Sequence, residues 1–324
     1  MTIAYGIFSG GLDSLLAARI LVDQDIEVRL LTFVTPFFSA KRAKISSQQI
    51  GLTTRPVEIT QSHLNMLENP KHGYGRFMNP CIDCHALMFN HAGRIMEEEE
   101  GDFLFSGEVL GQRPKSQIAW AMKLVARESG YADYILRPLS SLKLPPTKME
   151  LAGLVDRDRL LGLSGRSRKP QMELAAKFKI KDYPSPAGGC LLTDPIFSNR
   201  LKEFMSRTKQ LSHQDVKILK WGRHFRLPGG SKLVVGRNEK ENEIISKLSK
   251  PGDFILETVN IPGPTVIMSG SDPSDLELAA SITVSYGDSE PDQLYKVILT
   301  SDDGKKCLEA VRQAKEVFAH LMII

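Results

Sequence analysis

The residues best suited to chemistry lie near the start of the chain, in Ser9-Gly10-Gly11-Leu12-Asp13-Ser14. An apolar run precedes this hexapeptide and a run with helical spacing follows it, which predicts a turn between a buried strand and a helix. Two glycines let the backbone approach a ligand, and the first turn of a helix offers unpaired N–H groups, so together they can bind an anion. Ser9 and Ser14 add hydroxyl donors, and Asp13 can hold Mg²⁺ on a phosphate. A nucleotide phosphate is the predicted ligand.

The hexapeptide differs from two common nucleotide motifs. No lysine follows the glycines, as it does in Gly-x-x-x-x-Gly-Lys-Ser/Thr, and the spacing Gly-x-Gly-x-x-Gly is absent. The hexapeptide resembles the PP-loop, Ser-Gly-Gly-x-Asp-Ser, of the ATP pyrophosphatases in the adenine nucleotide α-hydrolase superfamily. In that family the loop grips the pyrophosphate of ATP while a substrate oxygen attacks the α-phosphate, so the resemblance implies adenylation with ATP and Mg²⁺. The alternative is an ordinary Gly-Gly turn without a ligand.

The strands and helices that position this loop are predicted from the sequence pattern. Apolar runs indicate strands, and the segments between them, such as residues 40–50, have helical spacing. We expect strands at residues 3–8, 27–34, 55–59, 102–107 and 134–139. Strands that alternate with helices predict an α/β fold with a doubly wound parallel sheet, of the PP-loop or HUP-like type that the resemblance implies. In such a sheet the ligand binds at the carboxyl ends of the strands, where Gly107-Glu108 lies as well as the hexapeptide.

A second motif follows the fourth predicted strand, with Gly107, Glu108, Gly111, Gln112 and then Ser116-Gln117. It is similar to the second motif of the tRNA 4-thiouridine synthases, a thiolating branch of the PP-loop enzymes, with one extra residue before Ser-Gln. At a strand tip Glu108 can accept a bond from a ribose hydroxyl or support the metal, and Gln112 can bridge loop and substrate. The alternative is an ordinary connection between a strand and a helix.

Three cysteines supply a further chemistry. Cys81 and Cys84 form a Cys-x-x-Cys pair, and Cys190 follows Gly188-Gly189. The stretch Gly-Cys-Leu-Leu-Thr-Asp at 189–194 resembles one in thiolating PP-loop proteins, which implies that the thiols carry sulfur to a tRNA base. In one mechanism a cysteine accepts a persulfide sulfur from a desulfurase and attacks the adenylated uridine, and a second cysteine resolves the resulting disulfide.

In the other mechanism the three thiolates hold a 4Fe–4S cluster whose fourth iron is left open to bind hydrosulfide. Cluster-dependent tRNA thiolases carry this Cys-x-x-Cys plus one remote cysteine, and an odd count of soft ligands favours the cluster. Two other interpretations stay open, a structural zinc held with a histidine such as His85 and a plain redox pair. The fourth cysteine, Cys307, falls in a predicted helix, 305–321, as a buried or bystander thiol.

The totals are those of an ordinary globular protein. The chain has 324 residues, enough for two domains, with 42% hydrophobic and 25% charged residues. It shows no signal-like start and no apolar run of about 18 residues, so we expect a cytoplasmic protein with no membrane partner. Four cysteines suit metal or redox work in a reducing compartment better than a disulfide framework. The net charge of +4 is too modest to argue for nucleic acid by itself.

After a first domain at 1–197, residues 198–324 are predicted to form a smaller α+β domain. Two alternating runs meet at Pro228-Gly229-Gly230, which predicts a hairpin, and a helix follows Asn238. The residues from Leu233 to Asn238, with Gly252-Asp253-Phe254 and 261–266, resemble the RNA-binding domain of the NFACT proteins. Residues 200–247 hold twelve Lys/Arg against five Asp/Glu. The predicted RNA-binding residues are Arg223, Arg226, Lys232 and Arg237.

Aromatic and basic residues nearby have two interpretations each. Trp221 and Phe225 can stack on a base or belong to the core. The basic segment 148–181, which we expect to be helical, can line a nucleic-acid groove or present a solvated face.

Together the motifs predict an AMP-forming tRNA sulfurtransferase that adenylates a uridine carbonyl oxygen and replaces it with sulfur, as in 4-thiouridine. Its partners are tRNA and a sulfur donor, either a cysteine desulfurase or hydrosulfide. The predicted catalytic residues are Cys81, Cys84, Cys190 and Asp13. The predicted nucleotide-binding residues are Ser9, Gly10, Gly11, Leu12, Asp13, Ser14, Gly107, Glu108 and Gln112. The alternatives are a persulfide-based 2-thiouridylase, an amidating or nitrile-forming ligase with structural zinc, and a non-catalytic RNA-binding module that senses nucleotide.

Overall fold

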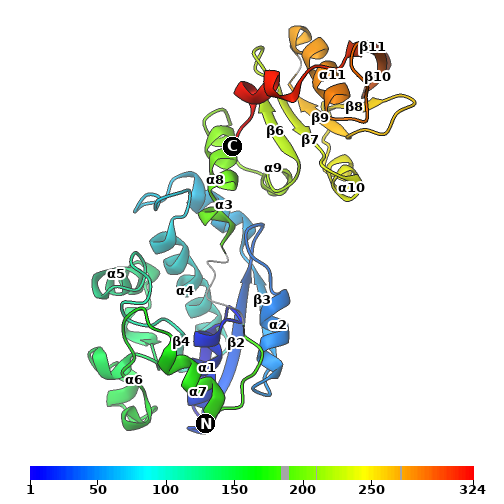
Figure 1. The fold of residues 1–324 in the computed structure, drawn as a ribbon. Coiled ribbons are helices and arrows are strands. Elements are labelled where there is room, and N and C mark those ends of the chain that lie inside the picture. The colour runs from blue at the N-terminus through cyan, green and yellow to red at the C-terminus, as the bar shows by residue number, and fades with distance from the viewer. Residues whose placement is uncertain (184–189, 209, 271) are drawn as a thin grey trace. The chain divides into compact units, whose positions relative to one another are not determined.

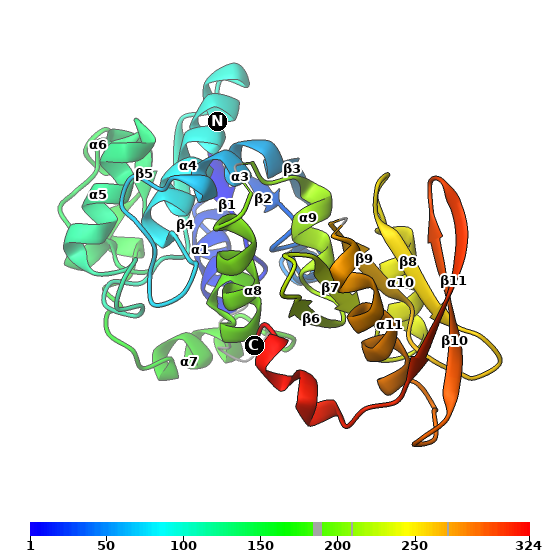
Figure 2. The same ribbon diagram turned by 90° about the horizontal axis from the view of Figure 1, so that it is seen from above.

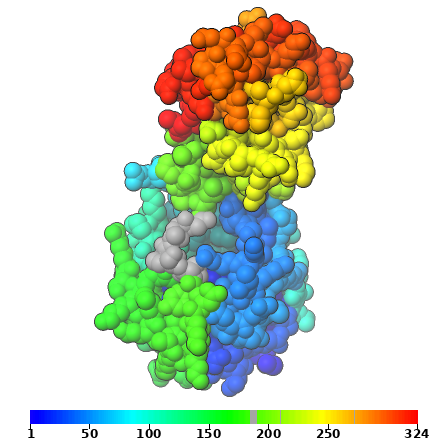
Figure 3. Space-filling model, turned by 45° about the vertical axis from the view of Figure 1, so that its right-hand side comes forward, coloured from blue at the N-terminus to red at the C-terminus, as the bar shows by residue number. Residues whose placement is uncertain are grey.

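The computed structural model describes residues 1–183, 190–208, 210–270 and 272–324. The chain divides into two compact units, Met1–Thr193 and Asp194–Ile324 (Figures 1 and 3). Within the described ranges, no helix combines the length and the apolar character needed to cross a bilayer.

The first unit is built on a five-stranded sheet in the order β3-β2-β1-β4-β5, in which every neighbouring pair is parallel. The strands are β1 (Ile3–Ile7), β2 (Glu27–Val34), β3 (Thr54–Glu58), β4 (Phe103–Ser106) and β5 (Ile135–Leu136). The chain runs outward from β1 to β3 and then returns to place β4 on the other side of β1. The order therefore reverses between β1 and β4, which confirms the doubly wound sheet and makes this point the expected ligand site.

Helices cover both faces of this sheet (Figure 1). The helices are α1 (Leu12–Val22), α2 (Lys41–Gln48), α3 (Thr60–Glu68), α4 (Cys81–Glu98), α5 (Ala119–Ser129), α6 (Lys148–Leu151) and α7 (Lys169–Lys177). Neighbouring strand residues point to opposite faces, so Ala4 packs in the cluster that contains α1 and Ala175 of α7. Tyr5 packs instead with Phe89 of α4 and Val125 of α5. Because helices cover both faces, the central strands read as apolar runs, whereas the edge strand β3 is mostly exposed and mixed in composition.

The second unit holds an antiparallel six-stranded sheet in the order β11-β10-β8-β9-β7-β6 (Figure 2). Its strands are β6 (Arg223–Arg226), β7 (Lys232–Val235), β8 (Phe254–Thr258), β9 (Val266–Ser269), β10 (Leu294–Ser301) and β11 (Gly304–Val311). Its helices are α8 (Pro195–Met205), α9 (His213–Ile218), α10 (Glu239–Lys247) and α11 (Leu276–Ser285). Leu233 and Val235 of β7 pack in the cluster that includes α11, whereas Val234 packs against Ile245 of α10. The α+β fold and the predicted hairpin of β6 and β7 are confirmed.

Two predictions of helix are wrong. The region predicted as a helix at 305–321 forms strand β11, paired with β10, and only Lys315–Leu321 is helical, as a 3₁₀ helix. Cys307 therefore lies on a strand and is exposed, not buried. Within 148–181 only α6, α7 and a 3₁₀ turn at Arg157–Arg159 are helical. Gly153 and Gly165 have positive φ there, a conformation that ends a helix.

Gly107 allows the loop after β4 to reach the hexapeptide at the start of α1. A Cβ added at Gly107 would lie 2.5 Å from the carbonyl carbon of Asp13 and from the backbone nitrogen of Ser14. Backbone cannot move aside as a side chain can, so the two loops must separate. We expect Gly107→Ala to lower the free energy of unfolding by about 1–3 kcal/mol.

The melting temperature measures this cost, and Gly162→Ala is the matched control. Its added Cβ would meet no atom closer than a side-chain carbon of Leu142, at 3.3 Å. Equal melting temperatures for the two variants would contradict the close approach of the loops.

Candidate nucleotide site and cysteine cluster

The hexapeptide forms the turn from β1 into α1 and is fixed by bonds within itself and to α2. The Ser14 hydroxyl donates to the Gly11 carbonyl at 2.8 Å, and the Gly11 N–H donates to Ser9 Oγ at 3.3 Å. Ser46 of α2 donates to the carbonyl of Gly10, whose φ of +73° suits glycine. No side chain caps α1 at Gly11. The start of α1 therefore keeps the backbone arrangement that binds anions.

Leu12 differs from the rest of the hexapeptide because its side chain is fully buried in the core. It can offer a nucleotide only its backbone, and its side chain holds the turn against the sheet.

Asp13 is the point at which three segments meet. Gln112, from the loop after β4, donates to Asp13 Oδ2 at 2.7 Å, and Gln171 of α7 donates to Gln112 Oε1 at 2.9 Å. Burial raises the pKa of Asp13, while the Gln112 hydrogen bond and the charge of Arg168 oppose that shift. The other carboxylate oxygen, Oδ1, is buried without a hydrogen-bond partner among the described residues. An ionised oxygen of this kind fits a Mg²⁺ ligand.

Glu108 is buried at the end of β4 and is bonded on several sides. Arg137 donates to Oε2 at 2.9 Å, Ser106 donates to the same oxygen, and His85 Nδ1 lies 3.0 Å from Oε1. Burial alone would raise the pKa of Glu108, but the charges of Arg137 and His85 outweigh it and hold the pKa at about 2. Glu108 therefore joins α4 to the end of β4. Its contact with a ribose or metal stays a prediction.

The three predicted thiols lie near one another in the first unit. Cys81 begins α4 and accepts a bond from Asn79 Nδ2 at 3.2 Å. Burial raises the pKa of Cys84, and the neighbouring Cys190 and Cys81 thiols raise it further. Burial also raises the pKa of Cys190, against the charge of Arg113, which lowers the pKa of Asp13 as well. Arg113 thus lies within electrostatic reach of both Asp13, in the predicted nucleotide loop, and Cys190.

Histidine placement differs from the prediction at this cluster. His85, the predicted candidate for a zinc ligand, is turned toward Glu108, whereas His63 Nε2 lies 3.4 Å from Cys84 Sγ. Burial lowers the pKa of His63 to about 4, so its ring is neutral at pH 7. Within the described part of the chain, no three His, Cys, Asp or Glu side chains are grouped to hold a single metal ion. Gly188-Gly189, before Cys190, lie outside the described residues.

The basic residues predicted to bind RNA are distributed between internal bonds and the surface. Arg226 pairs with Glu203 at 2.7 Å, and Arg223 lies over the ring of Tyr286. Lys232 is buried over the ring of Phe204, and burial lowers its pKa to about 8. Its ammonium has no direct access to solvent. Phe225 is a core residue, and Trp221 packs against the cluster around Val234.

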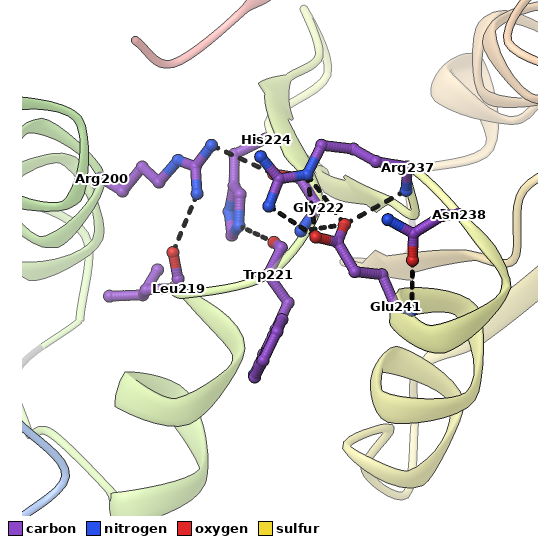
Figure 4. A network of polar contacts seen from close by, with 8 residues as sticks. All are labelled: Arg200, Leu219, Trp221, Gly222, His224, Arg237, Asn238 and Glu241. Carbon is purple, nitrogen blue, oxygen red and sulfur yellow. Dashed lines mark hydrogen bonds and ion pairs between the residues drawn. The ribbon is translucent and has the colours of Figure 1, made fainter.

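Arg237 is exposed and belongs to a network around Gly222 (Figure 4). Glu241 accepts bonds from the Arg237 guanidinium and from the backbone N–H groups of Arg237 and Gly222. Arg200 of α8 donates to the Gly222 carbonyl from the other side, at 3.1 Å. Asn238 caps α10, as expected, by accepting from the Glu241 N–H at 3.0 Å. The network holds the Arg237 guanidinium at the surface in a fixed orientation.

Fold and site together describe a doubly wound α/β unit with the predicted phosphate-binding turn at its switch point, followed by an antiparallel α+β unit. Residues 222–320 match the family model described as the NFACT protein RNA binding domain, which confirms the resemblance predicted for this region. No curated protein matches the chain.

Several solved structures are similar to parts of the chain. A 4-thiouridine synthetase in complex with RNA and ATP is 18% identical with a TM-score of 0.35, over 55% of this chain and 52% of its own. A predicted tRNA methyltransferase subunit from Methanocaldococcus jannaschii is 16% identical with a TM-score of 0.36, over 55% and 76%. The C-terminal part of a fibronectin/fibrinogen-binding protein from Streptococcus suis is 15% identical with a TM-score of 0.29, over 48% and 73%. Likenesses at this level do not bear on substrate or reaction.

The buried Glu108 predicts a specific dependence of stability on pH. Its folded pKa of about 2 lies below the ordinary value of 4.5, so ionised Glu108 stabilises the fold above pH 4.5. That contribution is lost as the pH falls toward 2. We expect Glu108→Gln to lower the free energy of unfolding by about 3–5 kcal/mol near pH 7, because Arg137 is left buried without its charge partner.

The melting temperatures of the wild type and Glu108→Gln, compared between pH 2 and 7, test this. The gap between them should narrow below pH 4.5, whereas Glu277→Gln, an exposed change on α11, should leave the melting temperature nearly unaltered. A gap that does not depend on pH would contradict the assigned ion pair.

Proposed function

We propose that this chain is an AMP-forming tRNA sulfurtransferase of the 4-thiouridine type. One observation carries the proposal: a glycine turn that leads into an uncapped helix at the switch point of the sheet, together with three neighbouring thiols in the same unit. Glu108 and His85 link the two features, since one lies at the end of β4 and the other in the first turn of the helix that carries Cys81 and Cys84. Neither a redox pair nor a bare nucleotide sensor needs this combination.

The first step activates the uridine. A carbonyl oxygen is a poor leaving group until it is joined to a phosphate, so the uridine oxygen attacks the α-phosphate of ATP and pyrophosphate departs. The backbone of the turn and the start of α1 would bind the departing pyrophosphate and stabilise its charge. Asp13, through Oδ1, would hold Mg²⁺, which supplies further neutralisation of the phosphates when bound. Gln112 and Gln171 keep the carboxylate oriented.

The second step replaces AMP with sulfur. In the persulfide form, a cysteine carrying a donated sulfur attacks the activated ring carbon, and AMP leaves with the original oxygen. A second cysteine then attacks the sulfur bonded to the protein, which frees the thiolated base and leaves a disulfide for a thiol reductant to reduce. All three cysteine residues are partly exposed. Cys84 Sγ lies against His63 Nε2, so Cys81 and Cys190 suit these roles better.

The same three thiols also have the soft donor character that a 4Fe–4S cluster requires. Such a cluster, when bound, would supply an iron with an open position for sulfide. Each thiolate of a cluster binds a different iron, so this arrangement does not require a shared single-ion site.

The second unit would hold the RNA. Its match to an RNA-binding domain supports this role, and Arg237 is the predicted contact with the greatest exposure. We expect Arg237→Ala to weaken tRNA binding several-fold and to reduce the salt slope of binding by about one. Filter binding of the full chain at several salt concentrations measures both quantities. Arg127→Ala, an exposed arginine on α5, is the control, and an unchanged slope in Arg237→Ala would argue against this contact.

The proposed reaction is tested on anaerobically purified protein with ATP and bulk tRNA. We expect AMP and pyrophosphate to form only when tRNA is present, and the tRNA digest to contain a thiolated uridine by mass spectrometry. Cys81→Ala and Cys190→Ala should abolish the thiolated nucleoside, whereas Cys307→Ala, on β11, should retain it.

The other outcomes identify the alternatives. A protein that binds tRNA but never forms AMP is the non-catalytic RNA-binding module. Stoichiometric zinc with AMP formation but no thiolated product would indicate a ligase. Iron and sulfide that disappear in Cys81→Ala and Cys190→Ala would support the cluster over the persulfide form.

A further inference from the structure

The phosphate-binding turn, residues 9–14, contains no basic side chain, although the pyrophosphate of ATP brings several negative charges to it. Nucleotide loops of the Gly-Lys type meet this need with their own lysine. In this chain a side-chain cation that assists the backbone and Mg²⁺ would have to come from another segment that folds against the turn.

Arg168 is placed to provide that charge. It is the N-cap residue of α7, directly before Lys169, and its side chain is 17% exposed. Its Nη2 atom lies 3.9 Å from Asp13 Oδ1, which is an ion pair but too long for a hydrogen bond. The position is fixed, because Gln171, one turn further along α7, is buried and bonded to the Gln112 side chain that holds Asp13.

The polar atoms between these two residues are incompletely paired. Arg168 Nε and Asp13 Oδ1 are both buried, and neither has a hydrogen-bond partner in the described part of the chain. Burying such a group unpaired costs about 1–3 kcal/mol, and more when it is charged. An arginine whose only role is to neutralise a carboxylate usually closes to about 2.7–2.9 Å. The open spacing therefore suits a guanidinium that acts on a third group bound beside Asp13.

A second cation, Arg113, also influences Asp13, but its side chain is exposed in the loop after β4. The charge of Arg113 also lowers the pKa of Cys190, so Arg113 is not dedicated to the turn. Arg168 is the more buried of the two, and a guanidinium binds phosphate more strongly where water is excluded.

We propose that Arg168 is the phosphate-binding cation of this site, donating to the phosphate oxygens of ATP while Asp13 faces the accompanying Mg²⁺. The proposal rests on the nucleotide site proposed above and names the residue that replaces a loop lysine. Guanidinium is well matched to phosphate because its planar N–H groups can bond two oxygens at once. Arg168 is thus assigned to nucleotide binding and not to an RNA groove.

Binding measurements on the full chain without tRNA test this assignment. Titration calorimetry would give the Kd of Mg·ATP and of adenosine for the wild type, Arg168→Gln, Arg168→Lys and the exposed control Arg127→Gln. We expect Arg168→Gln to weaken Mg·ATP binding by about tenfold to a hundredfold with adenosine binding nearly unchanged. The affinity of Arg168→Lys for Mg·ATP should lie between those of the wild type and Arg168→Gln, and the affinity of Arg127→Gln should equal that of the wild type.

Each other outcome overturns the assignment in a recognisable way. If Arg168→Gln binds Mg·ATP as tightly as the wild type, Arg168 does not hold the phosphates, while the nucleotide site itself stands. If Mg·ATP and adenosine weaken equally and the melting temperature falls, Arg168 has only a structural role. If the wild type binds no nucleotide, the proposed function fails and this assignment fails with it.

Discussion

The first unit depends on one buried carboxylate, that of Glu108, which pairs with the buried guanidinium of Arg137 and lies within hydrogen-bond distance of the partly exposed His85. Burying a carboxylate and a guanidinium is costly, and their attraction offsets that cost only when their hydrogen bonds are made together. Because the three residues come from the end of β4, the segment after β5 and the first turn of α4, their bonds fix where α4 begins. The thiols of Cys81 and Cys84 are therefore positioned by a carboxylate that has no sulfur chemistry of its own.

Asp13 is likewise held by residues from distant parts of the chain. Its side chain is approached by an amide from the loop after β4 and by a guanidinium from the start of α7, so three remote segments define one small volume. This follows from the doubly wound topology, which brings the carboxyl ends of β1 and β4 side by side. The glycine at 107 makes the approach close enough for direct contact of the two loops.

Local sequence patterns predict most of the strands of the first unit. They do not predict which residues from distant parts of the chain contact one another. Buried apolar runs gave the positions of the parallel strands, and 27–34 coincides with β2. Leu308, Val311, Ala314 and Val317 recur every three residues, which favours a helix, and only pairing with β10 selects the strand. His63 and Arg168 lie far along the chain from Cys84 and Asp13, and nothing in their neighbourhoods predicts the contacts. Glu203 and Phe204 of helix α8 likewise contact Arg226 and Lys232, which lie on strands β6 and β7.

The exposure of Cys307 has a practical consequence for work on the other three thiols. Alkylating reagents attack the thiolate, so a thiol that is buried with a raised pKa, such as Cys84, reacts slowly. Cys307 sits on β11, a strand at the margin of its sheet, where a reagent can approach it freely. A maleimide dye would therefore mark the second unit at Cys307 before it reaches Cys84.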